Sequence, residues 1–408
     1  MKTNFQTIII GCGVTGAAIA YSLTQAGHRD ILLLERNTPV NGATAKAATL
    51  VSLARSYASV IPFVRETIRQ IHVLSTGEPE ALGYYRVGSI HVAATGNSAR
   101  GLDKTYKVSG SHGVIGETIT LRKVGAEVPW LDAGSILNAY RYRDDGFVDG
   151  YLLTMAYLNA AREGGVEIVS GCEARTVMPM AAGGYSIATD KVQFHAQKVI
   201  LAAGAWTNLL LEPLEQSIPF TPVRSQYWIT GYNPRQFPAR HPICILPDAR
   251  AYTRPENGSL IVGWREPQCI WLDPHDLPDN AYSYTFRQDP DGWNNFEGCV
   301  ESLAGHFPDL GDQEIAHYIS GFSTYTPDGL FNLGPVPGFP GLYAAAGCAG
   351  MGIAVCGGIG RAMAELVLTG KSALPVEAFS LARFGKVNAS TTAFMQRCAD
   401  ARAGKKTG

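Results

Sequence analysis

Three glycines and an acidic residue near the start of the chain have spacings suited to binding phosphate and ribose. The run TIIIGCGVTG covers residues 7–16, and ILLLE follows at residues 31–35. Gly11 permits a tight strand-to-helix turn, Gly13 lets the backbone approach a pyrophosphate, and Gly16 lets the helix pack on the sheet. Glu35 is placed to accept hydrogen bonds from ribose hydroxyls. Because the amides of the helix N-terminus would face the phosphates, the pattern predicts a dinucleotide site.

Further elements that would position this site lie later in the chain. Residues 198–206, KVILAAGAW, form an apolar run that enters a glycine turn, which is typical of a buried central strand that meets a ligand at its carboxyl end. Residues 60–75 and 151–162 have helical spacing, whereas 118–145 are rich in Gly, Pro and Asp and are expected to be loops. From 215 to 325, alternating strands such as 220–230, 251–254 and 259–264 predict an antiparallel sheet.

The order of these segments predicts an α/β protein (α+β overall) with two packed domains. A Rossmann-like dinucleotide-binding domain would be interrupted by a substrate domain with a mostly antiparallel β-sheet. The predicted dinucleotide-binding domain comprises residues 1–84, 146–214 and 326–408, and the predicted substrate domain comprises 85–145 and 215–325.

Composition narrows the class of protein. The 408 residues are 46% hydrophobic and 17% charged with a net charge of −1, so nothing favours nucleic acid or an anionic membrane as a partner. The eight cysteines show no CxxC and no metal-ligand spacing, which predicts reduced, mostly buried thiols and no metal site. The first residues run directly into a strand, so we expect no signal peptide and a cytoplasmic location.

One apolar segment has the length of a membrane span. Residues 341–360, GLYAAAGCAGMGIAVCGGIG, carry no charge, but seven of the twenty are glycine. The opening GLYAAAG is typical of a strand and turn. We therefore expect a buried strand–turn–helix that closes over a cofactor, and no integral membrane segment.

Four motifs along the chain together resemble a known family. GCGVTG with Glu35, VILAAGAW at 199–206, TPDGLFNLGPVPG at 326–338 and the glycine-rich run at 341–370 are similar to the D-amino-acid oxidase superfamily. The resemblance is to its branch of sarcosine oxidase, dimethylglycine dehydrogenase, glycine oxidase and D-amino-acid dehydrogenase. It implies FAD rather than NAD, bound in a Rossmann-like domain of the glutathione-reductase type.

The resemblance also implies which residues hold FAD. Arg36 would lie beside the adenine, the loop 43–47 along the phosphates and flavin, and residues 350–353 against the pyrimidine side of the flavin. The implied cofactor-binding residues are Gly11, Gly13, Val14, Thr15, Gly16, Glu35, Arg36, Ala43, Thr44, Lys46, Ala47, Ala174, Gly204, Trp206, Gly350, Met351, Gly352 and Ile353.

The chain departs from the family pattern at five positions. Ala45 and Gly321 stand where some members attach flavin covalently, so we expect non-covalent FAD. Ile261 stands where sarcosine oxidase has an oxygen-activating lysine. Ala354 and Ser323 replace a lysine and an arginine that bind the substrate carboxylate in family members.

Substrate-facing candidates must therefore come from elsewhere in the sequence. Period-2 alternation puts Arg224 on one face of its strand with Gln226 and Trp228, where it could grip a carboxylate or form a structural ion pair. Tyr252 matches a substrate-facing tyrosine of the family. The full set of predicted catalytic residues is Arg224, Tyr252, Arg55, Tyr57, Tyr325 and Met351, with Arg265 and Ser323 as weaker candidates.

The resemblance implies an FAD-dependent amine or amino-acid oxidase or dehydrogenase. A C–N bond would be oxidised by hydride transfer to flavin N5, giving an imine that water hydrolyses. The electron acceptor would be O2 or a redox partner. Two alternatives remain open: an FAD-dependent oxidase or dehydrogenase of 2-hydroxy acids, and a flavin-binding subunit of a multi-subunit dehydrogenase.

Overall fold

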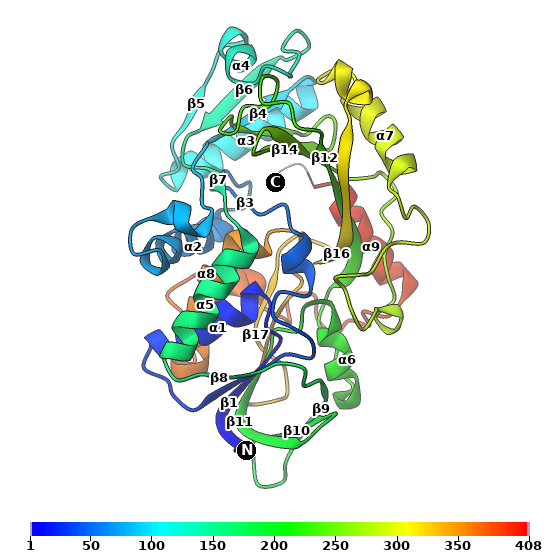
Figure 1. Cartoon of the computed structure of the whole chain (residues 1–408). Coiled ribbons are helices and arrows are strands. Elements are labelled where there is room, and N and C mark those ends of the chain that lie inside the picture. The colour runs from blue at the N-terminus through cyan, green and yellow to red at the C-terminus, as the bar shows by residue number, and fades with distance from the viewer. Residues whose placement is uncertain (1, 406–408) are drawn as a thin grey trace.

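Two eight-stranded sheets organise the computed structural model, which describes residues 2–405 (Figure 1). The first sheet has the order β17-β18-β11-β1-β2-β8, with β9 and β10 attached to β11 as an antiparallel extension. Its strands are β1 (Asn4–Ile10), β2 (Ile31–Leu34), β8 (Glu167–Val169), β9 (Ala174–Pro179), β10 (Tyr185–Thr189), β11 (Gln193–Leu201), β17 (Asn332–Pro335) and β18 (Leu342–Ala346).

The central strands of this sheet are parallel. β1 pairs with β2 and with β11, and β11 pairs with β18, all in parallel register. All four residues of β2 are buried, in keeping with its unbroken apolar sequence. The carboxyl ends of β1 and β11 meet at one edge, because Ile10 lies opposite Leu201. The predicted glycine turn and the predicted central strand are thus brought together.

Close helix packing covers one face of this sheet. α8 (Gly352–Thr369) contacts α1 (Val14–Gln25) and α2 (Ile61–Leu74), and α5 (Gly150–Glu163) contacts α1. A Cβ on Gly358 would lie 2.3 Å from the Phe63 Cα, and one on Gly360 would lie 2.5 Å from the Ala18 carbonyl oxygen. Glycines in α8 therefore let its backbone approach two helices that come from distant parts of the sequence.

The second sheet is mostly antiparallel. Its order is β16-β12-β15-β14-β13-β4-β6-β5, and only β13 with β4 pairs in parallel. The strands are β4 (Ser89–Ala93), β5 (Gly116–Thr118), β6 (Asn138–Tyr142), β12 (Thr221–Thr230), β13 (Ile243–Leu246), β14 (Ala251–Glu256), β15 (Ser259–Trp264) and β16 (Ile315–Tyr325). The α3 (Gly96–Ser111), α4 (Leu121–Glu127) and α7 (Trp293–Leu303) helices lie beside this sheet (Figure 1).

Smaller elements join the two sheets. β3 (Leu50–Val51) pairs with β7 (Gly146–Phe147), the short helix α6 (Thr207–Leu211) follows β11, and the 3-10 helix η1 (Ala43–Lys46) follows β2. All strands of the second sheet fall in residues 89–142 and 221–325, inside the predicted ranges of the substrate domain. The finer domain boundaries stay a prediction.

Two regions differ from the sequence expectations. The segment 118–145 contains α4 and β6 instead of loops alone, because β6 is stabilised by pairing with β4, a contact that local composition does not reveal. α9 (Thr392–Ala403) falls in the predicted dinucleotide-binding range but packs against β12 and β16 of the second sheet (Figure 1). A buried ion pair, described below, holds it there.

The apolar segment 341–360 forms β18, a turn and the first half of α8, as expected. Within residues 2–405, α8 is the one helix with the length and hydropathy of a membrane span, and 72% of that stretch is buried inside the protein. Its apolar residues therefore form core contacts with α1 and α2.

Adding one methyl group at Gly358 tests this packing. We expect Gly358→Ala to lower the free energy of unfolding by about 2 kcal/mol, since the new Cβ would overlap the Phe63 backbone. In Gly101→Ala, within α3, the Cβ meets nothing within 4 Å, so the better helix propensity should raise stability by roughly 0.5–1 kcal/mol. Urea denaturation of both variants measures the difference, and equal stabilities would contradict the packing.

Candidate functional site

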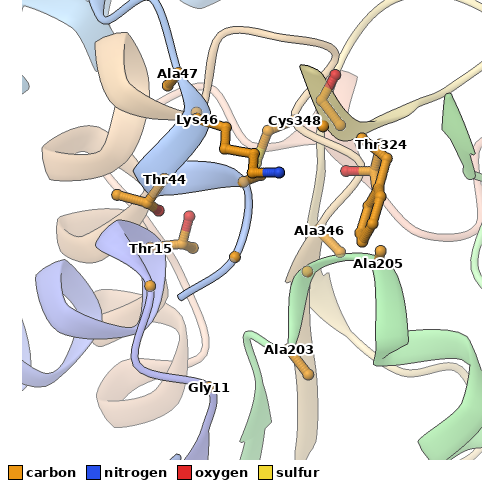
Figure 2. A pocket seen from close by; sticks show the side chains of 18 of the residues that line it. Gly11, Thr15, Thr44, Lys46, Ala47, Ala203, Ala205, Thr324, Ala346 and Cys348 are labelled. Atoms are coloured by element: carbon orange, nitrogen blue, oxygen red, sulfur yellow. The ribbon is translucent and has the colours of Figure 1, made fainter. Parts of the chain in front are cut away.

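A cavity of about 610 Å³ runs between the two sheets. It begins at the turn after β1, passes η1 and the turns after β11 and β18, and reaches the strands of the second sheet. In Figure 2, Thr15, Thr44 and Lys46 lie on one side of this cavity, and Ala205 and Thr324 lie on the other. Every predicted cofactor-binding residue except Gly16 lines the cavity.

The turn after β1 has the close backbone approach that the glycine pattern predicts. Gly11 has φ +108°, and a Cβ there would lie 2.5 Å from the Ala202 carbonyl oxygen. A Cβ on Gly16 would lie 1.9 Å from the Gly11 carbonyl oxygen, so Gly16 lets α1 pack directly against the turn without lining the cavity. α1 then begins at Val14, with no side-chain cap from Gly13 and no acidic residue in its first turn. Its N-terminus is therefore available to an anion.

The Glu35 carboxylate secures this turn. Its Oε2 accepts a hydrogen bond from the Cys12 amide at 2.9 Å, and its Oε1 accepts one from the Asn37 amide at 2.9 Å. Thr44 Oγ1, from η1, accepts a hydrogen bond from the Val14 amide at 3.2 Å. A carboxylate has further lone pairs in addition to these two bonds, so Glu35 retains acceptor capacity for ribose hydroxyls.

Arg36 and Trp206 form one wall of the cavity, although 170 residues separate them in the sequence. The guanidinium lies 4.1 Å from the centroid of the Trp206 ring, and its Nη1 lies 3.6 Å from the Glu173 carboxylate. This stacked pair, with Ala174 at the start of β9, provides a flat surface suited to an aromatic base.

The η1 loop approaches β16 closely. Lys46 Nζ donates a hydrogen bond to the Tyr284 carbonyl at 2.9 Å, and a Cβ on Gly321 would lie 2.8 Å from Lys46 Cδ. A side chain at position 321 would thus displace the aliphatic part of Lys46. Neither Gly321 nor Ala45 supplies a nucleophile for covalent flavin attachment.

A strained turn precedes α8. Ala349 has φ 49° and Gly350 has φ 73°, and a Cβ on Gly350 would lie 2.6 Å from the Tyr325 hydroxyl. α8 begins at Gly352 with no side-chain cap and no acid in its first turn. Its amides and dipole therefore face the cavity where negative charge would be stabilised.

The end of the cavity next to the second sheet contains several of the predicted catalytic residues. Tyr252, Tyr325, Met351 and Arg55 all line it, as does Arg265, whose guanidinium carbon lies 5.6 Å from the centroid of the Tyr252 ring. Ser323 also lines the cavity and shares a 2.7 Å hydrogen bond with Ser225.

Arg224 is not among the cavity-lining residues. Its Nε donates to Glu266 Oε1 at 3.0 Å, and its Nη2 donates to Asn295 Oδ1 at 3.1 Å. The other Glu266 oxygen accepts from Arg402 Nη1 at 2.7 Å, and all three charged side chains are buried. The structure thus places Arg224 in the ion pair that the sequence left open, and a protein carboxylate takes the position proposed for substrate.

Tyr57 is also outside the main cavity. It is 49% exposed, donates a hydrogen bond to the Asp328 carbonyl at 3.3 Å, and lines a smaller neighbouring cavity of about 450 Å³. The two cavities share Arg55, Tyr325, Met351 and Lys405. Lys405 was not predicted, because its surroundings ARAGKKTG give no sequence signal beyond that of a charged, solvated segment.

Arg55 is buried near Asp145 and His91, and its charge affects the pKa of both groups. Burial lowers the pKa of Arg55 to about 10, and the Asp145 carboxylate opposes that shift. Asp145 accepts hydrogen bonds from Ser52, Ser89 and the Leu53 amide, but burial still raises its pKa. Burial and then Arg55 lower the pKa of His91 to about 3, so that imidazole is neutral.

Fold and cavity together define a flavin-dependent oxidoreductase. The chain belongs to the DAO family of FAD-dependent oxidoreductases, whose family profile matches residues 6–366. FAD is therefore the cofactor, and the glycine cradle, the Glu35 carboxylate and the N-termini of α1 and α8 fit its ribose, pyrophosphate and flavin.

Several relatives are amine and amino-acid enzymes. The chain is 27% identical to dimethylglycine dehydrogenase of Rattus norvegicus over 94% of this chain and 45% of the relative. It is 28% identical to 4-methylaminobutanoate oxidase of Paenarthrobacter nicotinovorans over 94% of this chain and 46% of the relative. It spans about half the length of these relatives. L-proline dehydrogenase from P. horikoshii shares the fold, with a TM-score of 0.82, 22% identity, and 94% and 98% of the two chains covered.

Acid denaturation tests how FAD is held. We expect trichloroacetic acid to precipitate a colourless protein and to leave all flavin in the supernatant, because Ala45 and Gly321 offer no bond-forming atom. Absorbance of the pellet and supernatant measures the partition. Flavin that remains with the pellet would show a covalent link.

Proposed function

We propose that this chain oxidises a C–N bond in an amine that carries a carboxylate, with an N-alkylated amino acid as the substrate class. The observation that carries the proposal is the separation of charge along the cavity. The acids that line it, Glu35, Glu173 and Asp279, lie at the adenosine end, where Glu35 bonds the Asn37 amide and the Asp279 carbonyl accepts from the Asn37 side chain.

The opposite end is lined by basic side chains. Arg55, Arg265 and Lys405 line the cavity there, around Tyr325 and Gly350. Arg402 also lines it and forms an ion pair with Glu266. Within residues 2–405, no Asp or Glu side chain lines this end. A lining with basic side chains and no acidic ones favours an anionic ligand.

Arg265 is the residue best placed to bind the carboxylate. Arg265 is 5% exposed, and its guanidinium lies next to Tyr252, which supplies a hydroxyl in the same part of the cavity. Guanidinium presents N–H donors in a planar fork that matches the two oxygens of a carboxylate. The bond from Nη1 to the Lys405 carbonyl holds this fork in the cavity wall.

The residues of this chain then orient and desolvate the substrate. When bound, FAD supplies the two-electron acceptor for hydride from the carbon next to nitrogen, and water hydrolyses the resulting imine. Met351 and Tyr325 border the same space and exclude water from it. The amides at the start of α8 would stabilise negative charge that develops opposite them.

The names of the relatives support an N-alkylated substrate. Dimethylglycine, 4-methylaminobutanoate and proline each combine a carboxylate with an alkylated amine. A 2-hydroxy acid would use the same carboxylate contacts but offers no nitrogen lone pair.

The position of the oxygen-activating lysine of sarcosine oxidase lies away from the cavity. Ile261, which stands there, is buried and does not line the cavity, so it does not distinguish O2 from a redox partner as electron acceptor.

The free cysteines, seven of them buried, favour the predicted cytoplasmic location, which stays a prediction.

Anaerobic reduction of the holoenzyme tests this function. We expect N,N-dimethylglycine, 4-methylaminobutanoate or L-proline to bleach the flavin band near ~450 nm, the signature of the oxidised cofactor. D-lactate should leave it unchanged. Bleaching by lactate alone would favour the hydroxy-acid alternative, whereas no bleaching by any of the four would favour a flavin-binding subunit that lacks this activity.

A matched pair of arginine variants tests the carboxylate contact. Arg265→Met should raise the KM for the reducing amine by roughly 10- to 100-fold, because a charge-assisted contact of about 1.5–3 kcal/mol is lost. Arg235→Met makes the same change at an exposed site and should leave KM unaltered. An unchanged KM in Arg265→Met would exclude Arg265 as the carboxylate ligand.

A further inference from the structure

The segment that follows α9 brings an amine into the cavity. Lys405 lines both the main and the smaller cavity. Its Nζ donates a hydrogen bond to the Ala349 carbonyl at 3.0 Å, and its own carbonyl accepts one from Arg265 Nη1 at 3.1 Å. Lys405 is therefore held at two points, between the proposed carboxylate ligand and the turn that precedes α8.

Buried interactions fix the end of α9 that carries this lysine. Arg402 Nη1 lies 2.7 Å from Glu266 Oε2 and 3.0 Å from the Cys269 Sγ, and the Lys405 amide donates to the Arg402 carbonyl at 3.2 Å. A Cβ on Gly350 would lie 3.5 Å from Lys405 Nζ and 2.6 Å from the Tyr325 hydroxyl. The amine thus has a defined position beside the space in which substrate would be oxidised.

Oxidation of an amine creates a need for a proton acceptor. The ammonium of an alkylated amine holds its proton with a pKa near ~10, like that of a lysine in water. The nitrogen lone pair must be free when hydride leaves the neighbouring carbon. A proton must therefore move from the substrate nitrogen to another group, either solvent or a side chain.

Four groups from four parts of the fold lie near Lys405: Arg265 follows β15, Arg55 follows β3, Arg402 belongs to α9 and Tyr325 ends β16. Tyr252 of β14 lines the same cavity beside Arg265. The arginines remain protonated, and burial raises the pKa of Tyr252, so that hydroxyl remains protonated too. Burial and the guanidiniums of Arg265, Arg55 and Arg402 hold the pKa of Lys405 well below its usual range.

The other amine of the cavity is less suitable. Burial also lowers the pKa of Lys46, but its Nζ is directed to the Tyr284 carbonyl and its aliphatic part packs on Gly321. Lys46 therefore lies on the η1 side of the cavity, whereas Lys405 is linked directly to Arg265.

We propose that Lys405 is the catalytic base that takes the proton from the substrate ammonium. The N–H bond of the ammonium breaks and its electron pair stays on the substrate nitrogen. The lone pair of Lys405 Nζ forms the new N–H bond, so the net charge of the cavity does not change. This inference rests on the proposed function, because it needs an ammonium substrate.

Proton uptake on anion binding tests Lys405 without any turnover. Acetate, a carboxylate without an amine, is titrated calorimetrically into the FAD-loaded protein in two buffers of different ionisation enthalpy, across a pH series. At pH values at which Lys405 is neutral in the free protein, wild type should take up about one proton for each acetate bound. The control variant Lys386→Met, which changes an exposed lysine, should do the same. Lys405→Met and Lys405→Arg should take up none. No uptake by wild type, or uptake that persists in Lys405→Met, would overturn the proposal.

The pH dependence of anaerobic flavin reduction tests the proton transfer itself. With the amine that bleaches the flavin, the loss of Lys405 should slow reduction at neutral pH by about 100-fold, and the rate should then rise about tenfold per pH unit as solvent deprotonates the substrate. Lys405→Arg places a permanent cation there that cannot accept a proton, so it should show the same slope. A wild-type profile in both variants would overturn the proposal.

The two experiments separate this inference from the proposed function. If no amine bleaches the flavin, the proposed function fails, and the proposed role of Lys405 as substrate base fails with it even where acetate uptake persists. If an amine bleaches the flavin but acetate causes no proton uptake, the proposed function stands and the role of Lys405 is excluded.

Discussion

A buried carboxylate between two buried guanidiniums holds the substrate end of this protein together. Glu266 bonds Arg224 of β12 through one oxygen and Arg402 of α9 through the other, and Gln226 Nε2 lies 3.3 Å from Oε2. A charge in the protein interior is tolerated only when it is paired and hydrogen-bonded, so these side chains have little freedom to rearrange. Since Arg265 precedes Glu266 and Lys405 follows Arg402, the same contact positions both Arg265 and Lys405 in the cavity.

Charge is distributed unequally along the cavity, and this distribution matches FAD together with the proposed carboxylate-bearing substrate. The adenosine end uses an acid, Glu35, together with the stacked Arg36 and Trp206, which suits hydroxyl groups and a flat base. The other end combines Arg55, Arg265 and Lys405 with two tyrosines. FAD and a carboxylate-bearing amine would therefore occupy opposite ends and meet at the turn before α8.

Close backbone contacts explain why glycine is needed at so many positions. At Gly11 and Gly16 a side chain would overlap backbone atoms of the first turn, and at Gly357 and Gly358 it would overlap the backbone of α2. These contacts set the distance between the sheet, α1 and α8. Because both α1 and α8 direct their N-termini at the cavity, the packing of their glycines also sets the position of two anion-binding ends.

The sequence by itself determined the features that depend on neighbouring residues. The strand, glycine turn and helix at 7–25, the acid at Glu35, and the strand–turn–helix at 341–369 are all present as predicted, because their conformations follow from apolar runs and from glycines at short spacings. The FAD-dependent family is likewise recognisable from these segments. In contrast, β6 was not predicted, since it depends on pairing with β4.

Only the tertiary structure decided which charged side chains reach the cavity. Arg224 had a strand pattern suited to a substrate ligand, but Glu266, 42 residues later, pairs with it. Arg265 and Lys405 had weaker signals or none, and they line the cavity because α9 returns to the second sheet and Arg402 bonds Glu266 across 136 residues. Local sequence cannot specify such pairings, because the energy of a buried charge depends on partners that are distant along the chain.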